Sequence, residues 1–210
     1  QPTAVVGLSD LVDLAAGGHT CGLRSDGSVW CWGGNHVGQL GDQTLEDSLE
    51  PVQVIGVSDA IRVVAGDSHT CALLASGEVW CWGEGFWGAL GNPETANVSY
   101  SLVPVIVDGL TDVTTLDAGG NSNCASRADG TMWCWGSGPM GGLLPSDFAP
   151  VPVQVPDLTG VTAAEAGWGT VAYALTADGV AWCWGNNGFG QCGTGTQEGA
   201  TPPVKVLPPP

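Results

Sequence analysis

The chain has 210 residues, of which 43% are hydrophobic and only 12% are charged, a balance that excludes an intrinsically disordered protein. No apolar run reaches the roughly 18 residues that a membrane-spanning helix needs, so we expect no membrane insertion. Four Lys and Arg residues stand against 21 acids, for a formal charge of −17, and this excludes nucleic acid and anionic lipid as partners because basic side chains bind both.

The first part of the chain predicts short strands separated by turns. An apolar stretch at residues 11–16 is followed by apolar segments at 19–23 and 29–33, and the Ser-Asp-Gly-Ser sequence at 25–28 predicts a hairpin between them. After a long loop, residues 51–57 predict a fourth strand. The 34 glycines and 14 prolines show no triplet period, which excludes collagen and agrees with many turns.

This four-strand unit recurs. The motif Trp-Cys-Trp-Gly appears four times at a spacing of about 50 residues, a period typical of propellers and solenoids; its first tryptophans are Trp30, Trp80, Trp133 and Trp182. We expect a single domain over residues 1–210. Its repeats are predicted at 9–57, 58–107, 108–155 and 156–206, with a Pro-rich tail at 207–210.

Both faces of the motif strand are apolar. Trp30 and Trp32 share one face, and Val29 and Cys31 share the other. A strand that is apolar on both faces must be buried on both faces, which stacked blades provide. The sequence therefore predicts an all-β fold, a β-propeller with four blades of about 50 residues.

The two ends of the array are predicted to need partners. Residues 1–8 look like a fifth copy of the Pro-Val strand that closes each repeat, and we expect them to form an extra edge strand. This strand would either complete a preceding blade in a longer parent chain or pair with a neighbouring subunit by strand addition. The first and last repeats keep the apolar motif instead of a polar outer face, so either the ring closes on itself or other subunits cover its ends.

Three ordered motifs suggest a family. The motifs A-G-x-x-H-T, D-G-x-V-W-x-W-G and G-x-x-x-x-G-Q-L-G recur in this order over about residues 11–206, with departures in individual repeats and the most in the third and fourth. This order resembles the repeat of the regulator-of-chromosome-condensation family, in a secreted bacterial-type W-C-W-G form. The resemblance implies a propeller, usually of seven blades, without one fixed function. Members include an exchange factor for a small GTPase, a plant ultraviolet receptor and secreted bacterial binding proteins. The chain departs from the pattern in having four repeats, with Ser122 in place of His and Cys192 in place of Leu40.

The eight cysteines predict disulfides. Three pairs are separated by ten residues, one cysteine on each arm of a predicted hairpin: Cys21 with Cys31, Cys71 with Cys81, and Cys124 with Cys134. If Leu23 pairs with Val29, the first two cysteines lie opposite each other, at a separation of ~4.5–5.5 Å that a disulfide accepts.

The fourth repeat breaks this spacing. Tyr173 occupies the first cysteine position, and Cys192 is an additional cysteine, which suggests a Cys183–Cys192 disulfide. A zinc site is the weaker alternative because no C-x-x-C spacing occurs; buried free thiols are a third. Disulfides persist in oxidising compartments, so we expect an extracellular, cell-surface or periplasmic protein. The chain begins Gln1-Pro2, as a mature form without its signal peptide or an excised piece would.

No catalytic, cofactor-binding or metal-binding residues are predicted, and we expect the protein not to be an enzyme. His19 and His69 recur at the structural period, so we expect each to form a hydrogen bond within its own blade. Four carboxylates gather in the loop after the first motif (Asp42, Glu46, Asp47 and Glu50), but their spacing does not follow a calcium loop. Solvated loop charge is the preferred interpretation, and a fortuitous Ca²⁺ site is the alternative.

Partner contacts are predicted in the loops. Phe86 and Trp168 are the candidate exposed aromatic anchors, and His36 occupies the position in the first repeat that Phe86 has in the second. The next position is apolar in every repeat, which we interpret as packing inside the protein; it is occupied by Val37, Trp87, Met140 and Phe189.

The first functional hypothesis is an extracellular scaffold that binds a protein or glycan partner. The alternative is a structural subunit that self-assembles into a homo-oligomeric ring, sheath or filament by strand addition and through its uncapped end blades. Asn97 lies in an Asn-Val-Ser sequon that would be glycosylated only in a eukaryotic source.

Overall fold

The computed structural model describes residues 5, 7–95, 98–138, 148–167 and 171–207, and it contains four four-stranded antiparallel sheets. Within each sheet the strands are hydrogen-bonded in chain order, so each sheet is a meander that uses consecutive strands. Each sheet is one blade of about 50 residues. The predicted all-β propeller fold is therefore confirmed.

The strands of the four blades have the following bounds. Blade 1 contains β1 (Leu11–Ala16), β2 (His19–Arg24), β3 (Val29–Gly33) and β4 (Ser48–Gln53). Blade 2 contains β5 (Ala60–Ala65), β6 (His69–Leu74), β7 (Val79–Glu84) and β8 (Tyr100–Ile106). Blade 3 contains β9 (Val113–Gly119), β10 (Ser122–Arg127), β11 (Met132–Ser137) and β12 (Phe148–Gln154). Blade 4 contains β13 (Val161–Gly167), β14 (Val171–Thr176), β15 (Ala181–Gly185) and β16 (Ala200–Lys205).

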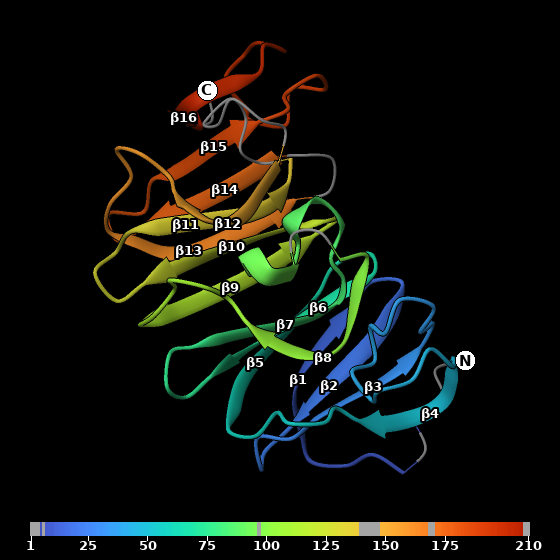
Figure 1. Cartoon of the computed structure of the whole chain (residues 1–210). Helices are drawn as coiled ribbons and strands as arrows, with labels where there is room; N and C mark the ends of the chain where they lie inside the picture. Colours follow the sequence, from blue (N-terminus) through green and yellow to red (C-terminus); the bar gives the residue numbers. More distant parts are fainter. Residues whose placement is uncertain (1–4, 6, 96–97, 139–147, 168–170, 208–210) are drawn as a thin grey trace.

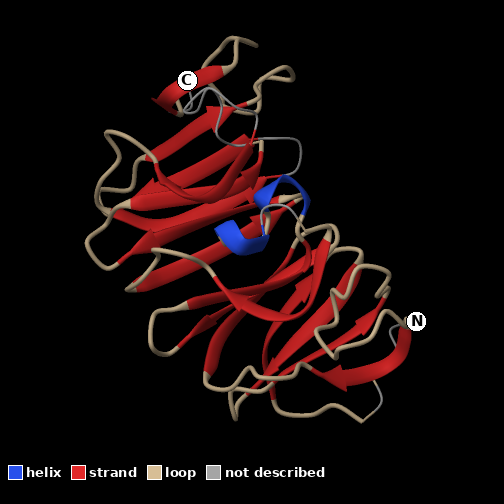
Figure 2. Ribbon diagram, viewed as in Figure 1, coloured by secondary structure: helices blue, strands red, loops and turns tan. Residues whose placement is uncertain are grey.

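The blades form an open arc, with blade 1 at one end and blade 4 at the other (Figure 1). The first strands of successive blades lie side by side along the inside of the arc. Apart from strands, the described residues form two short 3-10 turns, η1 (Phe86–Gly88) and η2 (Pro93–Thr95) (Figure 2). None of the described residues belongs to a helix long and apolar enough to cross a membrane. The extra strand expected at residues 1–8 lies largely outside the described residues.

The disulfides follow from the hairpin register. Leu23 pairs with Val29, and Cys21 then lies opposite Cys31 with their Cα atoms 4.0 Å apart. Blades 2 and 3 repeat this arrangement at Cys71–Cys81 and Cys124–Cys134. In blade 4 the bond joins Cys183 to Cys192, so all eight cysteines are paired.

Each blade has two different faces. The disulfide face carries the cystine, and the Trp face carries the second tryptophan of the motif (Trp32, Trp82, Trp135 or Trp184). The disulfide face of blade 2, with Leu73, Val79 and Cys81, packs against Trp135 and Leu116 on the Trp face of blade 3. Blades 1 and 2, and blades 3 and 4, pack in the same way, so the core is a series of three junctions between blades.

Two of the junctions contain a shared carbonyl group. The Gln39 carbonyl of blade 1 accepts hydrogen bonds from Thr70 Oγ1 (2.9 Å) and Trp82 Nε1 (3.0 Å) of blade 2. The Ala89 carbonyl of blade 2 likewise accepts from Asn123 Nδ2 (2.9 Å) and Trp135 Nε1 (3.1 Å) of blade 3. These bonds keep the donors paired although the tryptophans are fully buried.

The two recurring histidines extend this network. His19 Nε2 lies 2.6 Å from Thr70 Oγ1, and His69 Nε2 lies 2.9 Å from Asn123 Oδ1. Because Thr70 donates its own proton to the carbonyl group, the histidine nitrogen must be the donor. The expectation of a bond within the blade was wrong, since each histidine reaches the next blade.

Glycine is required where the inner loops of neighbouring blades meet. A Cβ atom at Gly17 would overlap the Gly66 carbonyl oxygen, and one at Gly119 would overlap the Ala166 carbonyl oxygen. The next residue in blade 1, Gly18, donates its N–H to the Asp67 carbonyl at 3.0 Å. The recurring Ala-Gly pair therefore reflects backbone packing against backbone.

Burial changes the ionisation of groups at the junctions. Burial lowers the pKa of His19 to about 4, assisted by the neighbouring His69 and His36. Burial also raises the pKa of Asp117 to about 6, against the opposing hydrogen bond from the Ala166 N–H (2.8 Å) that joins blade 3 to blade 4.

These shifts act on stability in opposite directions. Between pH 6.5 and about 4 the unfolded chain protonates His19 and the folded protein does not, so stability falls as the pH falls. In the window between the usual carboxyl pKa near 3.8 and about 6, the folded protein protonates Asp117 first, so this group favours folding as the pH falls.

We predict that His19→Gln flattens the acid side of the stability profile. The wild type should lose up to about 3 kcal/mol more than the variant between pH 7 and pH 4, because Asp117 is present in both proteins and cancels in the comparison. Urea unfolding at both pH values measures the difference. Equal losses in the two proteins would show that His19 does not cause the pH dependence.

Candidate functional site

The loops that follow β3, β7 and β15 lie at the same end of the blades as the short inner loops, because His19 pairs with Gly33, and the equivalent residues pair in blades 2 and 4. We call this end the loop face. The structure places Phe86 and His36 there, and both side chains are exposed. Trp168, Met140 and the sequon residue Asn97 lie outside the described residues.

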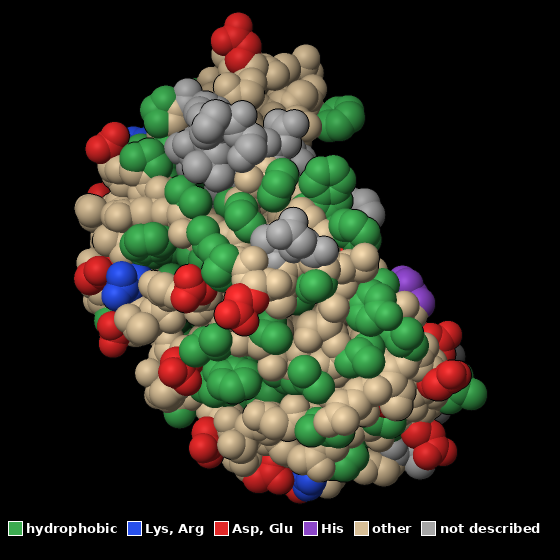
Figure 3. Space-filling model, viewed as in Figure 1, with side chains coloured by type: hydrophobic (Ala, Val, Ile, Leu, Met, Phe, Trp, Pro, Cys, Tyr) green, Lys and Arg blue, Asp and Glu red, His purple; other side chains and the backbone are tan. Residues whose placement is uncertain are grey.

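The most prominent exposed group on the loop face is aromatic. Phe86 and Trp87 follow each other in η1, and 53% and 54% of their surfaces are exposed. Trp87 packs edge to face against Phe148 of the next blade, with ring centroids 6.1 Å apart. We call these three residues the aromatic patch. Hydrophobic side chains gather over this part of the visible surface (Figure 3).

The turn that presents the patch has an unusual backbone. Trp87 has a φ angle of 62°, in the left-handed region that is costly for a bulky residue. In blades 1 and 4 the equivalent N–H groups, of Val37 and Phe189, donate to the side chains of Gln39 and Gln191. Blade 2 has Ala89 at that position, which has no side-chain acceptor.

The expectation that these apolar loop positions pack inside was wrong for two of them. Trp87 is half exposed and Phe189 is 93% exposed, while Val37 is half-buried. The sequence shows that the position is apolar in each repeat, but its burial depends on what the neighbouring blade places beside it.

Acidic groups lie near the aromatic patch. Glu84 is paired in the sheet with Tyr100, close to η1. Burial raises the pKa of Glu84, and the negative charge of Asp67 adds to this while His36 opposes it. A ligand that docks on the patch therefore meets acidic side chains beside the aromatic surface.

Two carboxylates of the acidic loop in blade 1 form hydrogen bonds within that loop. Asp47 accepts a hydrogen bond from the Asn35 N–H (2.7 Å), and Asp42 accepts one from Asn35 Nδ2 (3.2 Å). Among the described residues, no group of three or more His, Cys, Asp and Glu side chains is arranged to hold a metal.

Two of the three histidines lie in the junctions between blades. His19 and His69 are buried and their Nε2 atoms are hydrogen-bonded to the next blade. A separate hollow of about 370 Å³ lies where the turns of blade 4 meet the loop before β13, and it contains two aspartates, Asp157 and Asp178. In this hollow Thr176 Oγ1 donates a hydrogen bond to Asp178 Oδ1 at 2.6 Å.

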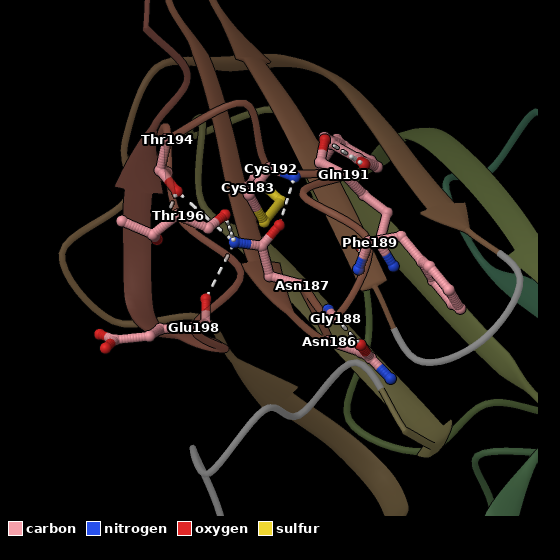
Figure 4. The surroundings of a disulfide bond; sticks show 11 residues. Cys183, Asn186, Asn187, Gly188, Phe189, Gln191, Cys192, Thr194, Thr196 and Glu198 are labelled. Carbon is pink, nitrogen blue, oxygen red and sulfur yellow. Dashed lines mark hydrogen bonds between the residues drawn. A yellow bond between two sulfur atoms is a disulfide. The ribbon is translucent and has the colours of Figure 1, made fainter.

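The loop of blade 4 is held by a disulfide and one buried amide (Figure 4). Asn187 Oδ1 accepts the Cys192 N–H at 2.9 Å, and its Nδ2 donates to the carbonyl groups of Thr196 and Glu198 at 3.0 and 2.9 Å. Asn35 makes equivalent bonds to Leu40 and Thr44 in blade 1. Asn187 and Asn35 therefore fix the loops that carry the exposed side chains of Phe189 and His36, respectively.

Family models match most of the chain. The model described as the regulator of chromosome condensation (RCC1) repeat matches residues 26–73, 76–126 and 178–210. A second model of the same description matches residues 12–39, 113–141 and 161–191.

The similar proteins are longer than this chain. A regulator of chromosome condensation from Xenopus laevis is 28% identical over 153 residues, which are 70% of this chain and 36% of the relative. Yeast RCC1 (Prp20), in a structure with Kap60, superposes with a TM-score of 0.81 at 21% identity, over 97% of this chain and 50% of the other. Human WBSCR16 superposes with a TM-score of 0.83 at 25% identity, over 95% and 53%. The chain thus spans about half the length, or less, of these proteins.

We predict that Asn187→Ala destabilises the protein by about 1–3 kcal/mol, because it leaves the N–H of the buried Cys192 without its acceptor and removes the bonds to the Thr196 and Glu198 carbonyl groups. Asn186→Ala is the matched control, since Asn186 is exposed and accepts one bond from Gly188. Urea unfolding measures both variants. Similar losses in the two would mean that the buried amide does not organise the loop.

Proposed function

The chain belongs to the regulator of chromosome condensation (RCC1) repeat family. From this membership and from the four disulfides, we infer that it is a non-catalytic scaffold that binds a protein partner outside the cytosol. The contact surface in this proposal is the aromatic patch on the loop face. His36 and Trp168, named from the sequence, stay predicted contacts beside it.

The exposed pair Phe86 and Trp87 carries the proposal. Large aromatic side chains dominate the binding energy of protein interfaces when a partner desolvates them. Here they are held in place before binding, because Trp87 rests on Phe148 and the neighbouring Gly88 packs against Pro150 of β12. A pre-organised patch loses less conformational entropy on binding.

The negative charge of the chain indicates what kind of surface the partner has. The chain has a formal charge of −17, and Glu84 and Asp67 lie near the patch. A protein surface that offers basic side chains around an apolar centre would be complementary to it. A protein is favoured over a glycan because Prp20, which shares the fold, was solved bound to the protein Kap60 and studied for its binding to Gsp1p and histones.

The disulfides support the location. Four disulfides, with no free cysteine, indicate an oxidising environment, and the extracellular space, the cell surface and the periplasm all provide one. An intracellular exchange-factor role does not fit such an environment.

We predict that the double variant Phe86→Ala/Trp87→Ala loses partner binding by at least about tenfold while its unfolding midpoint stays close to that of the wild type. Affinity capture from the extracellular fraction of the source, quantified by mass spectrometry, identifies proteins that wild type retains. Titration of each captured protein then gives the ratio of dissociation constants.

The control is Ile61→Ala, which removes an exposed apolar side chain from the inner strand β5, away from the loop face. It should retain the partner. If every captured protein binds the double variant as tightly as it binds the wild type and Ile61→Ala, the aromatic patch is not the binding surface.

A further inference from the structure

The end of the second strand carries a different side chain in different blades. Arginine stands there in blades 1 and 3, leucine in blade 2 and threonine in blade 4; the residues are Arg24, Arg127, Leu74 and Thr176. In blade 3, Trp133 of the motif is paired with Ala125, two residues before Arg127. Side chains two residues apart share one face of a strand, so the arginine lies on the Trp face beside the first tryptophan of its motif.

Blade 3 uses this arginine to fill a defined site on its Trp face. Arg127 Nε donates to the Thr111 carbonyl at 2.8 Å, and its Nη2 donates to Thr111 Oγ1 at 3.2 Å. The same Nη2 lies 3.6 Å from Asp112 Oδ2, and the guanidinium carbon lies 5.8 Å from the centre of the Trp133 ring. A carbonyl, a hydroxyl, a carboxylate and an indole ring therefore hold the guanidinium group.

Blade 1 holds its arginine at the same place, with one more carboxylate. Arg24 Nε donates to the Ser9 carbonyl at 3.3 Å. Its Nη2 lies 3.8 Å from Asp10 Oδ2, and its Nη1 lies 3.7 Å from Asp26 Oδ2. Ser9 and Asp10 precede β1, whereas Asp26 lies in the turn between β2 and β3. Two blades of this chain thus bind a guanidinium group with the same backbone carbonyl and with nearby carboxylates.

Blade 4 has the receptor groups without the arginine. The hollow of about 370 Å³ lies at the equivalent place, and we call it the blade 4 hollow. Its lining includes the counterparts of the threonine, the turn aspartate and the tryptophan, which are Thr159, Asp178 and Trp182. Neither the carbonyl nor the hydroxyl group of Thr159 has a hydrogen-bond partner among the described residues. The oxygens that hold a guanidinium group in blade 3 are therefore unused in blade 4.

The blade 4 hollow has a carboxylate of its own. Gly160 stands where Asp112 stands, so the carboxylate that pairs with Arg127 has no counterpart. Asp157 lines the hollow instead, at a turn position where the first three blades have glycine; these are Gly7, Gly56 and Gly109. Asp157 shares their left-handed backbone, with a φ angle of 57°. Such a position favours glycine, so the turn itself does not require a carboxylate.

The hollow lies at an internal junction of the array. Trp182 packs against the cluster of buried residues between blades 3 and 4, and residues 157–160 connect these two blades. The turn between β14 and β15 also lines the hollow, which places it at the end of the blades opposite the loop face. Both blades that border the hollow are therefore part of the described structure.

The indole ring of Trp182 already attracts one cation. Lys205 Nζ lies 5.2 Å from the centre of this ring. Lys205 comes from β16, whereas Thr176 comes from β14, and these strands flank β15 on opposite sides. The lysine therefore approaches Trp182 from the strand away from Thr176, and it is not among the described residues that line the hollow.

We propose that the blade 4 hollow receives an arginine side chain from a partner protein. The guanidinium group stacks on the Trp182 ring and donates to the two oxygens of Thr159. Its charge pairs with the carboxylates of Asp157 and Asp178. Arginine fits this site better than lysine, because its planar fork donates to several acceptors at once and stacks on aromatic rings. The inference goes beyond the proposed function, because the hollow and the aromatic patch lie at opposite ends of the blades.

The test titrates ¹⁵N-labelled protein with the peptide acetyl-Gly-Arg-Gly-amide and follows the indole N–H signal of Trp182, which Trp182→Phe identifies. We expect a saturable shift with a dissociation constant on the order of 1 mM, because one partly exposed guanidinium group forms only a few weak contacts. The same peptide with lysine in place of arginine should bind at least about threefold more weakly. Equal binding of the two peptides, or no shift at Trp182, overturns the proposal.

Two variants remove one carboxylate each. Asp157→Gly introduces the residue of the other three blades, so the fold should be kept while the arginine peptide binds at least about threefold more weakly. Asp178→Asn should weaken binding to a similar extent. The matched control is Asp129→Asn, the same change in blade 3, where Arg127 already occupies the site; it should leave the dissociation constant unchanged. Equal losses in Asp178→Asn and Asp129→Asn would show a general effect of negative charge and contradict the proposal.

A third variant fills the hollow from within. Thr176→Arg gives blade 4 the arginine that blades 1 and 3 have, so the peptide should no longer shift the Trp182 signal. A shift that persists in this folded variant would place the peptide elsewhere and overturn the proposal. The variant Phe86→Ala/Trp87→Ala should bind the peptide as the wild type does, which separates a failure of this proposal from a failure of the proposed function.

Discussion

The junction between two blades is the constraint on which the rest of the structure depends. Each junction buries an indole against a disulfide, and in two of them one backbone carbonyl pairs the indole N–H and a second polar group of the later blade. Leaving a buried N–H unpaired costs about 1–3 kcal/mol, so the donor and the acceptor must both be supplied. The Trp-Cys-Trp-Gly motif of the later blade supplies the indole donor, and the motif of the earlier blade supplies one cysteine of the disulfide. The loop that follows the motif in the earlier blade supplies the carbonyl group. This division explains why the motif and the loop recur together.

Much of the fold could be predicted because the repeat period and the hairpin register are local properties. Once Leu23 is paired with Val29, the opposition of Cys21 and Cys31 follows from strand geometry. The relocated bond of blade 4 could be predicted from the absence of one cysteine and the presence of another. These arguments need no knowledge of how blades are placed against each other.

The features that depend on a neighbouring blade could not be predicted in the same way. His19 reaches Thr70, which lies 51 residues further along the chain, and nothing within its own repeat indicates that partner. Trp87 and Phe189 look like packed residues in the sequence because their position is apolar in every repeat. In the structure, Trp87 contacts Phe148 and stays half exposed, whereas Phe189 is almost fully exposed. Phe86 was expected at the surface from its variable position, and it is exposed.

All four disulfides join residues within one blade, and none joins two blades. Under oxidising conditions the unfolded chain is therefore a string of pre-formed loops, three of which already have the native hairpin register. Folding then consists mainly of docking these units to their neighbours along the chain, which are contacts of moderate sequence separation and favour faster folding than a search over all strand pairings. The same arrangement means that a reducing agent should weaken every blade without directly releasing any junction.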